Sequence, residues 1–204
     1  AESCDSVAAD LATEEGRDTI FRAVPAVDIL ITNNAGPSPG TLADWNRDAW
    51  INAFEMNMIG PALVIRNYLP GMRARRFGRI VNITSAMVKS PRPHMALSSA
   101  ARTALTAFCK ALSLEAAADN VTINNLLPER IDTPRQQFMA ERTMKAESID
   151  IDEARRRIAL TVAAKRMGTP EEFGNACAYL CSAHGGFISG QNLQLDGGSY
   201  AGLI

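Results

Sequence analysis

The sequence predicts a doubly wound α/β fold, in which a parallel sheet is covered by helices on both faces. Short apolar runs rich in Val, Ile and Leu alternate along the chain with longer segments whose apolar residues recur every three or four positions. Strands that are apolar throughout are typical of a sheet buried on both sides. The repeated order of strand and helix is typical of parallel strands joined by helical crossovers.

The first elements follow this order from the start of the chain. Residues 6–10 (SVAAD) and 27–32 (VDILIT) are expected strands, and a helix ending near Val24 is expected between them. The second strand ends at Asn-Asn-Ala-Gly, a sequence that breaks regular structure. Residues 44–75 then repeat apolar side chains at helical spacing, and Pro61 is expected to kink this helix or to mark an early turn.

The same alternation continues to the end of the chain. The elements expected here are strands over 78–85 (GRIVNITS), 121–127 (VTINNLL) and 192–198 (NLQLDGG), and helices over 98–118, 135–166 and 168–183. The segment 135–166 is charged and is interrupted by SIDID. The last helix has Thr169 as its N-cap, Pro170 in its first turn and acidic residues near its positive end.

Length and composition indicate one globular domain over residues 1–204. Hydrophobic residues make up 47% and charged residues 21%, which is sufficient for a substantial core. Lys and Arg (21) nearly balance Asp and Glu (22), so no overall field directs the protein to nucleic acid or to a membrane. No apolar run reaches the roughly 18 to 20 residues of a membrane span, and no signal-peptide pattern opens the chain.

The four cysteines are expected to be reduced thiols in a cytoplasmic protein. Cys177 and Cys181 share one face of the last helix, and Cys4 and Cys109 lie elsewhere. Without a second pair or neighbouring histidines, this spacing does not predict a zinc site.

A basic cluster surrounds a turn at Gly78. Its members are Arg73, Arg75, Arg76 and Arg79. A solvated helix end is favoured over a binding patch, because cations are favourable near a helix C-terminus.

Ligands of open parallel sheets bind where the strands end at their carboxyl side. Polar or conformationally special residues follow four of the expected strands, so the candidate positions are Asp10, Asn33 to Gly36, Ser85, and Pro128 to Thr133.

These strand ends resemble the short-chain dehydrogenase/reductase family over essentially the whole chain. The matching strings are DILITNNAG, MNMIGPALVIRNYLPGM, GRIVNITS, TINNLLPERIDT, GTPEEF and ISGQNLQLDGG. The resemblance implies a three-layer Rossmann-type fold, NAD or NADP as cofactor, and a small carbonyl or alcohol substrate. It leans toward the 3-oxoacyl carrier-protein reductase-like branch.

The resemblance also implies roles for individual residues. Ser85 and Asn57 match the catalytic serine and the helix-borne catalytic asparagine of the family. Cofactor-binding roles are implied for Asp10, Asn33, Ala35, Gly36, Pro128, Ile131 and Thr133. Structural alternatives stay open: residues 33–36 could be only a strand-ending turn, and Asn57 could serve only to satisfy a neighbouring polar group.

One departure concerns the cofactor. The family's Gly-rich turn after its first strand does not occur in this sequence; GPSPG and GGFISG lack both the spacing and the strand-to-helix context. About two βα units expected from the family are absent. We expect that an N-terminal segment precedes these residues; the alternative is a truncated protein that binds no dinucleotide in the family manner and leaves an apolar sheet edge open.

The second departure concerns catalysis. The family places a tyrosine thirteen residues after its serine and a lysine four residues later, which gives Ser98 and Arg102 here. Serine is a far weaker acid than a phenol and is shorter, so Ser98 cannot act as the same proton donor. Arg102 keeps the positive charge and could still bind ribose hydroxyls, but it does not release its proton.

Other residues could supply the missing proton. His94, in a proline-bracketed loop, is the natural candidate because imidazole groups titrate near neutrality, and Lys89 is the second; for each, a solvated loop side chain is the favoured alternative. Among the tyrosines, Tyr200 alone is placed to approach the site. Glu129 stands where the family usually has glycine, and Arg130 or Arg102 is expected to neutralise it.

Two functions remain open from the sequence. The first is an NAD(P)-dependent oxidoreductase with an unusual proton donor, and the second is a non-catalytic relative that binds a nucleotide or small ligand. The resemblance implies a homodimer or homotetramer, and residues 135–166 are expected to form the substrate lid.

Overall fold

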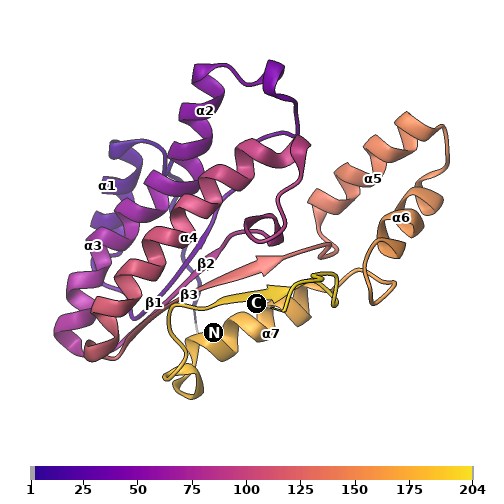
Figure 1. Cartoon of the computed structure of the whole chain (residues 1–204). Coiled ribbons are helices and arrows are strands. Elements are labelled where there is room, and N and C mark those ends of the chain that lie inside the picture. Colours follow the sequence, from indigo (N-terminus) through magenta and orange to yellow (C-terminus); the bar gives the residue numbers. More distant parts are fainter. Residues whose placement is uncertain (1–2, 204) are drawn as a thin grey trace.

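The computed structural model describes residues 3–203, which form a four-stranded parallel sheet with helices on both faces (Figure 1). The strands are β1 (Ile29–Asn33), β2 (Gly78–Ile83), β3 (Val121–Pro128) and β4 (Asn192–Leu195), and they lie in this order across the sheet. All three strand pairings are parallel, so every strand ends at the same edge of the sheet. The doubly wound α/β prediction is confirmed.

The helices divide between the two faces and the carboxyl edge of the sheet (Figure 1). Their bounds are α1 (Glu14–Ala23), α2 (Arg47–Phe54), α3 (Gly60–Arg75), α4 (Ala96–Ala116), α5 (Pro134–Glu147), α6 (Ile151–Leu160) and α7 (Pro170–Cys181). Helices α1, α3 and α4 cover one face, and α7 covers the other. The α5–α6 hairpin extends beyond the carboxyl ends of the strands, where the sequence predicts a lid.

Alternation along the strands produces two separate cores. Ile80 and Ile123 are fully buried against α3 and α4, in a cluster that includes Tyr68. Val81 and Leu126 point to the opposite face and pack against α7. This is why the strands are apolar at consecutive positions.

A chain of polar side chains crosses the sheet in one register layer. Thr32 Oγ1 donates to Asn82 Oδ1 at 2.7 Å, Asn82 Nδ2 donates to Asn125 Oδ1 at 3.2 Å, and Asn125 Nδ2 donates to Asn192 Oδ1 at 2.8 Å. These four residues are register partners on β1 to β4. Because a slip of one strand would leave buried amides without partners, the chain fixes the alignment of the strand ends.

The expected strand over residues 6–10 is wrong. These residues are irregular, and the sheet ends instead at β1. Backbone groups form a strand only where a neighbouring strand pairs with them, and none of the described strands lies beside residues 6–10. Ile29 and Ile31 of β1 point to the same face as Val81 and are 47% and 48% exposed, so α7 does not cover this part of the sheet.

The helix expected over residues 44–75 runs without a break from 47 to 75, but a π turn interrupts its α-helical hydrogen bonding. A 3₁₀ turn (Leu42–Asp44) precedes α2, and a π-helical turn (Glu55–Ile59) separates α2 from α3. Pro61 lies in the first turn of α3, directly after the π turn, so the prediction of an early turn is confirmed. The π turn carries the buried Asn57, and such turns occur often at functional sites.

The arginines of the basic cluster form ion pairs and hydrogen bonds within the fold. Arg73 pairs with Asp119 at 2.6 Å, and Arg75 pairs with Asp28 at 3.0 Å. Arg79 is 2% exposed and donates to the carbonyl of Asn120. The solvated-helix-end prediction therefore holds for Arg73 and Arg75, whereas Arg79 is buried because its carbonyl partners lie inside the fold.

The described residues hold no cluster of three or more His, Cys, Asp or Glu side chains that could bind a metal ion. Within residues 3–203, no helix combines the length and apolar character needed to cross a membrane.

The four thiols are expected to differ sharply in reactivity. Cys4 is exposed, whereas Cys109 is 1% exposed and burial raises its pKa to about 12, so this thiol stays protonated near neutral pH. Burial also raises the pKa values of Cys177 and Cys181. Because the thiolate is the nucleophile, Ellman's reagent at pH 8 should modify Cys4 fast and the other three slowly. A Cys4→Ser variant should lose the fast phase; retention of that phase would contradict the predicted burial.

Candidate active site

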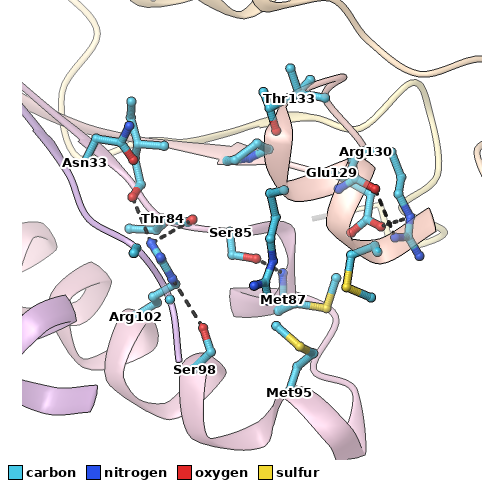
Figure 2. Close-up of a pocket in the computed structure, with 18 of the residues that line it drawn as sticks. Asn33, Thr84, Ser85, Met87, Met95, Ser98, Arg102, Glu129, Arg130 and Thr133 are labelled. Carbon is cyan, nitrogen blue, oxygen red and sulfur yellow. Dashed lines mark hydrogen bonds and ion pairs between the residues drawn. The ribbon is translucent and has the colours of Figure 1, made fainter. Parts of the chain in front are cut away.

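A cavity of about 640 Å³ lies at the carboxyl edge of the sheet, where β1, β2 and β3 end (Figure 2). Its lining comes from the loop after β1, the loop after β2, the start of α4, the loop after β3, and α5. Cavities of this size hold small molecules and parts of cofactors. The cavity thus lies at the edge where the strand-end rule predicts a site, and Asp10 does not line it.

Ser85 lies at the end of β2, between the Arg102 side and the Glu129 side of this cavity (Figure 2). Its Oγ accepts a hydrogen bond from the backbone N–H of Met87 at 3.2 Å. Since a hydroxyl both accepts and donates, the hydrogen of Ser85 remains available to an oxygen in the cavity. Ser85 can therefore orient a carbonyl or alcohol oxygen.

Asn57 is 2% exposed and supports the loop after β1 from behind the cavity. Its Nδ2 lies 3.3 Å from the carbonyl oxygens of Ala35 and Ala53, to which it donates. Its Oδ1 is buried and has no hydrogen-bond partner among the described residues. A buried acceptor of this kind is commonly satisfied by an ordered water.

Arg102 is used almost entirely by the protein itself. Its Nη1 donates to the carbonyl oxygens of Ile83 and Thr84, both at 3.0 Å, and its Nη2 donates to that of Asn34 at 2.9 Å. The side chain thereby joins the ends of β1 and β2 from α4. Burial, followed by repulsion from Arg135, lowers the pKa of Arg102 to about 10, so the guanidinium remains charged at neutral pH.

Ser98 is the remaining partner of Arg102. Its Oγ accepts from Arg102 Nε at 3.4 Å, and the residue is only 4% exposed. The backbone of Gly36 passes directly above: a Cβ there would lie 3.3 Å from both Ser98 Oγ and Arg102 Nη2. The position of the family's tyrosine is thus closed over by a glycine loop, and Ser98 contributes little surface to the cavity.

Most residues with an implied cofactor role line the cavity. They are Asn33, Ala35, Gly36, Pro128, Ile131 and Thr133. Thr133 is the N-cap of α5, but its hydroxyl makes no capping hydrogen bond and is free for a ligand. Asp10 is not part of this lining; its carboxylate accepts from the backbone N–H of Ala12 at 2.9 Å.

The three alternative proton donors lie in different places. His94 is exposed and lines the cavity from the turn before α4. Lys89 lies 5.1 Å above the ring of Tyr200, and neither residue is part of the lining. His94 is therefore the one of the three that the fold brings to the cavity.

Glu129 is neutralised as expected by Arg130, whose Nε lies 3.2 Å from Oε1. Arg102 forms no ion pair with it. Instead, Arg92 donates to the same oxygen at 3.3 Å. Arg92, Met87 and Met95 also line the cavity and carry no motif in the sequence; the nearest signal is Pro91 and Pro93, which indicate a loop.

Comparison with known proteins identifies the same family over the whole site. The family model described as enoyl-(acyl carrier protein) reductase matches residues 2–200. The chain is 32% identical over 197 residues to the NADPH-dependent reductase BacG of Bacillus subtilis, covering 95% of this chain and 76% of that protein. It is 31% identical over 191 residues to an acetoacetyl-CoA reductase of Cupriavidus necator, covering 93% and 73%.

Solved structures agree with the sequence comparisons. The crystal structure of L-sorbose reductase from Gluconobacter frateurii, complexed with NADPH and L-sorbose, superposes with a TM-score of 0.90 at 29% identity, covering 97% of this chain and 77% of that one. The NADPH-dependent reductase YwfH, involved in bacilysin biosynthesis, superposes with a TM-score of 0.89 at 30% identity. With the strand-end motifs gathered around one cavity, these matches show that the chain belongs to the short-chain dehydrogenase/reductase family.

Proposed function

We propose that the protein is an NAD(P)-dependent oxidoreductase that interconverts a carbonyl and an alcohol on a small molecule, in the manner of 3-oxoacyl reductases. The observation that carries this proposal is the convergence of three strand ends on one cavity, which Ser85, Ile131 and Thr133 line together and in which the Ser85 hydroxyl can still donate. The reductase relatives described above support the same chemistry.

The residues present fit the nicotinamide end of such a cofactor. The hydroxyl of Thr133, which makes no capping hydrogen bond, and the loop at Pro128 and Ile131 would hold it. Asn33, Ala35 and Gly36 would border it. When bound, the nicotinamide supplies or accepts the hydride. Ser85 would hold the reacting oxygen, and the buried charge of Arg102 stabilises negative charge near it.

The proton requires a different route from that of the family. Ser98 is buried and already accepts from Arg102, so no side-chain acid stands at this position. In the reducing direction we propose that the oxygen takes its proton from water or from His94 at the cavity mouth. A slow chemical step is expected, because loss of a positioned acid costs on the order of 10² to 10⁴ in rate.

A second candidate function is ligand binding without turnover. The observation that favours it is the saturation of Arg102 by three carbonyl oxygens, which leaves little of the guanidinium for a ribose. A homodimer or homotetramer, a cytoplasmic location and a lid role for α5 and α6 remain expectations from the resemblance and the composition.

Replacement of Ser85 by Ala tests the proposed role of its hydroxyl. Fluorescence titration with NADPH and NADH, followed by a screen of small carbonyl compounds, should reveal binding and slow reduction by the unaltered protein. Ser85→Ala should bind the same nucleotide but lose about 10²-fold in kcat/KM, since a hydrogen bond to the reacting oxygen is removed.

Ser90→Ala, in the same loop but outside the cavity lining, is the matched control and should keep full activity. Nucleotide binding without turnover would favour the second candidate. If neither NADPH nor NADH binds, the oxidoreductase function and a binding function that uses a dinucleotide are both refuted.

A further inference from the structure

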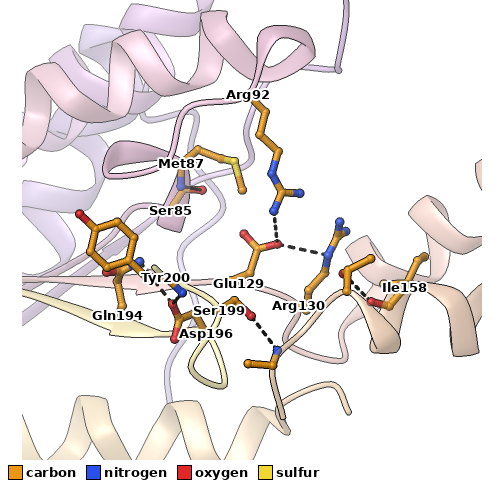
Figure 3. A network of polar contacts seen from close by, with 12 residues as sticks. Ser85, Met87, Arg92, Glu129, Arg130, Ile158, Gln194, Asp196, Ser199 and Tyr200 are labelled. Carbon is orange, nitrogen blue, oxygen red and sulfur yellow. Dashed lines mark hydrogen bonds and ion pairs between the residues drawn. The ribbon is translucent and has the colours of Figure 1, made fainter. Parts of the chain in front are cut away.

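A cluster of three charged side chains forms one side of the cavity (Figure 3). Glu129 lies between Arg92 and Arg130, and both arginines approach the same oxygen, Oε1, at 3.3 and 3.2 Å. The arginines come from different walls, Arg92 from the loop before α4 and Arg130 from the loop after β3. The side chains of Glu129 and Arg130 are only 8% and 15% exposed, whereas that of Arg92 is 40% exposed.

The cavity carries net positive charge although the chain as a whole has a formal charge of −1. Glu129 is the only carboxylate among the lining residues, and it is set against Arg92, Arg102, Arg130 and Arg135. Arg135, in the first turn of α5, forms no ion pair with any described residue. Cavities lined by one sign of charge concentrate ligands of the opposite sign.

The two arginines of the cluster make fewer hydrogen bonds than Arg102, so most of their Nη donors are unused by the described residues. The Arg130 Nε is buried and forms no hydrogen bond although it lies 3.2 Å from Oε1, and Nη1 makes one long hydrogen bond of 3.4 Å to Gln136. Arg92 has one hydrogen bond, through Nη2. Paired guanidinium donors of this kind are suited to a carboxylate.

The backbone holds Arg130 in a special conformation. Its φ is +54°, in the left-handed region that a residue with a side chain seldom adopts. The hydrogen bond from the Gly168 N–H to the Arg130 carbonyl, at 3.0 Å, keeps it there. Such conformations persist where the surrounding structure imposes them, and they cluster at ligand-binding sites.

An apolar surface lies beside the charged cluster. Met87, Met95 and Met139 line the cavity, and Figure 3 shows Met87 and Ser85 near Glu129. Methionine side chains are flexible and adapt to apolar groups of different shape. The cavity thus offers a hydrogen-bond donor for a reacting oxygen, an apolar wall and a cationic cluster.

We propose that the substrate carries a carboxylate in addition to the reacting carbonyl or hydroxyl group. The protein then acts on a short oxo acid or the corresponding hydroxy acid, with the carboxylate bound by Arg92 and Arg130 and the carbon chain against the methionines. Glu129 orients the two guanidiniums. This assignment rests on the proposed oxidoreductase function and specifies its substrate class.

The experiment compares oxo acids of four to eight carbons, beginning with acetoacetate, with their methyl esters, which keep the ketone and remove the charge. In the unaltered protein with the nucleotide that binds, kcat/KM for at least one acid should exceed that for its ester by tenfold or more. Arg92→Gln should lower the value for the acid by about 10- to 100-fold, as expected for loss of a charge-assisted hydrogen bond, and change that for the ester less than threefold.

Two further variants control this comparison. Arg92→Lys keeps the charge and should retain part of the preference for the acid. Arg66→Gln, an exposed position on α3 outside the cavity, should leave it unchanged. Equal kcat/KM for every acid and its ester, or a preference that survives Arg92→Gln, would overturn the assignment while leaving the oxidoreductase function intact.

If no compound is turned over, calorimetric titration with the same acids and esters tests the carboxylate site separately from the oxidoreductase function. Binding of an acid that is weakened tenfold or more by Arg92→Gln, with no reaction, would refute the oxidoreductase function but support the carboxylate site. Absence of binding by all the acids, or equal binding by acids and esters, would refute the carboxylate site.

Discussion

Replacement of Arg102 by Met is expected to lower the free energy of unfolding by about 3–5 kcal/mol. The variant leaves the carbonyl oxygens of Asn34, Ile83 and Thr84 without their donors, and each buried unsatisfied group costs about 1–3 kcal/mol, partly offset by water. Arg102→Lys should lose less, about 1–3 kcal/mol, because an ammonium keeps the charge but cannot span three carbonyls. Urea unfolding followed by circular dichroism measures both changes.

Arg66→Met is the matched control for this series, because Arg66 is exposed on α3. It should change stability by no more than about 0.5 kcal/mol. A loss for Arg102→Met as small as that for the control would show that the bonds between α4 and the strand ends contribute nothing to stability.

The double variant Ser98→Tyr/Arg102→Lys is expected to raise kcat by about 10²- to 10⁴-fold on any carbonyl that the unaltered protein reduces slowly. It places a phenol and an ammonium at the family's two positions, and a neighbouring cation brings the phenol pKa from about 10 toward neutrality. The Gly36 backbone lies close against position 98, so the loop after β1 must shift to admit the ring. Steady-state rates across pH 5–10 measure the gain and should show a new ionisation.

Ser98→Phe/Arg102→Lys has nearly the same shape but no hydroxyl, and it should gain nothing. Equal rates for the Tyr and Phe variants would mean that the proton does not come through position 98. Both variants lose the Arg102 hydrogen bonds, so they need to be compared at a temperature where each is folded.

The contrast between Arg102 and the Arg92–Glu129–Arg130 cluster explains how one cavity can contain so many arginines. Arg102 acts on the backbone, from a helix to two strand ends, and is almost saturated. Arg92 and Arg130 line the cavity, meet at a single carboxylate and make few other hydrogen bonds. The first is a positioning residue, and the other two are proposed to touch the substrate.

The sequence by itself determined the α/β class, the four strands that form the sheet, and the edge at which the cavity lies. Apolar periodicity and strand-ending residues are local signals. The spacing of the family motif, counted from Ser85, identifies Ser98 and Arg102 as the residues at the tyrosine and lysine positions. The π turn within residues 44–75 and the absence of a strand at residues 6–10 did not follow from these signals. Helix breaks and strand pairing depend on neighbours that are distant in the chain.

Only the tertiary structure decided which groups Arg102, at the family's lysine position, contacts. The sequence gives Arg102 a charge, but its partners Asn34, Ile83 and Thr84 are 68, 19 and 18 residues away. The meeting of Arg92 with Glu129, 37 residues apart, likewise depends on two loops that the parallel sheet brings to one edge. Local patterns do not determine such contacts, because they arise when strand register and helix packing fix the distances between separate segments.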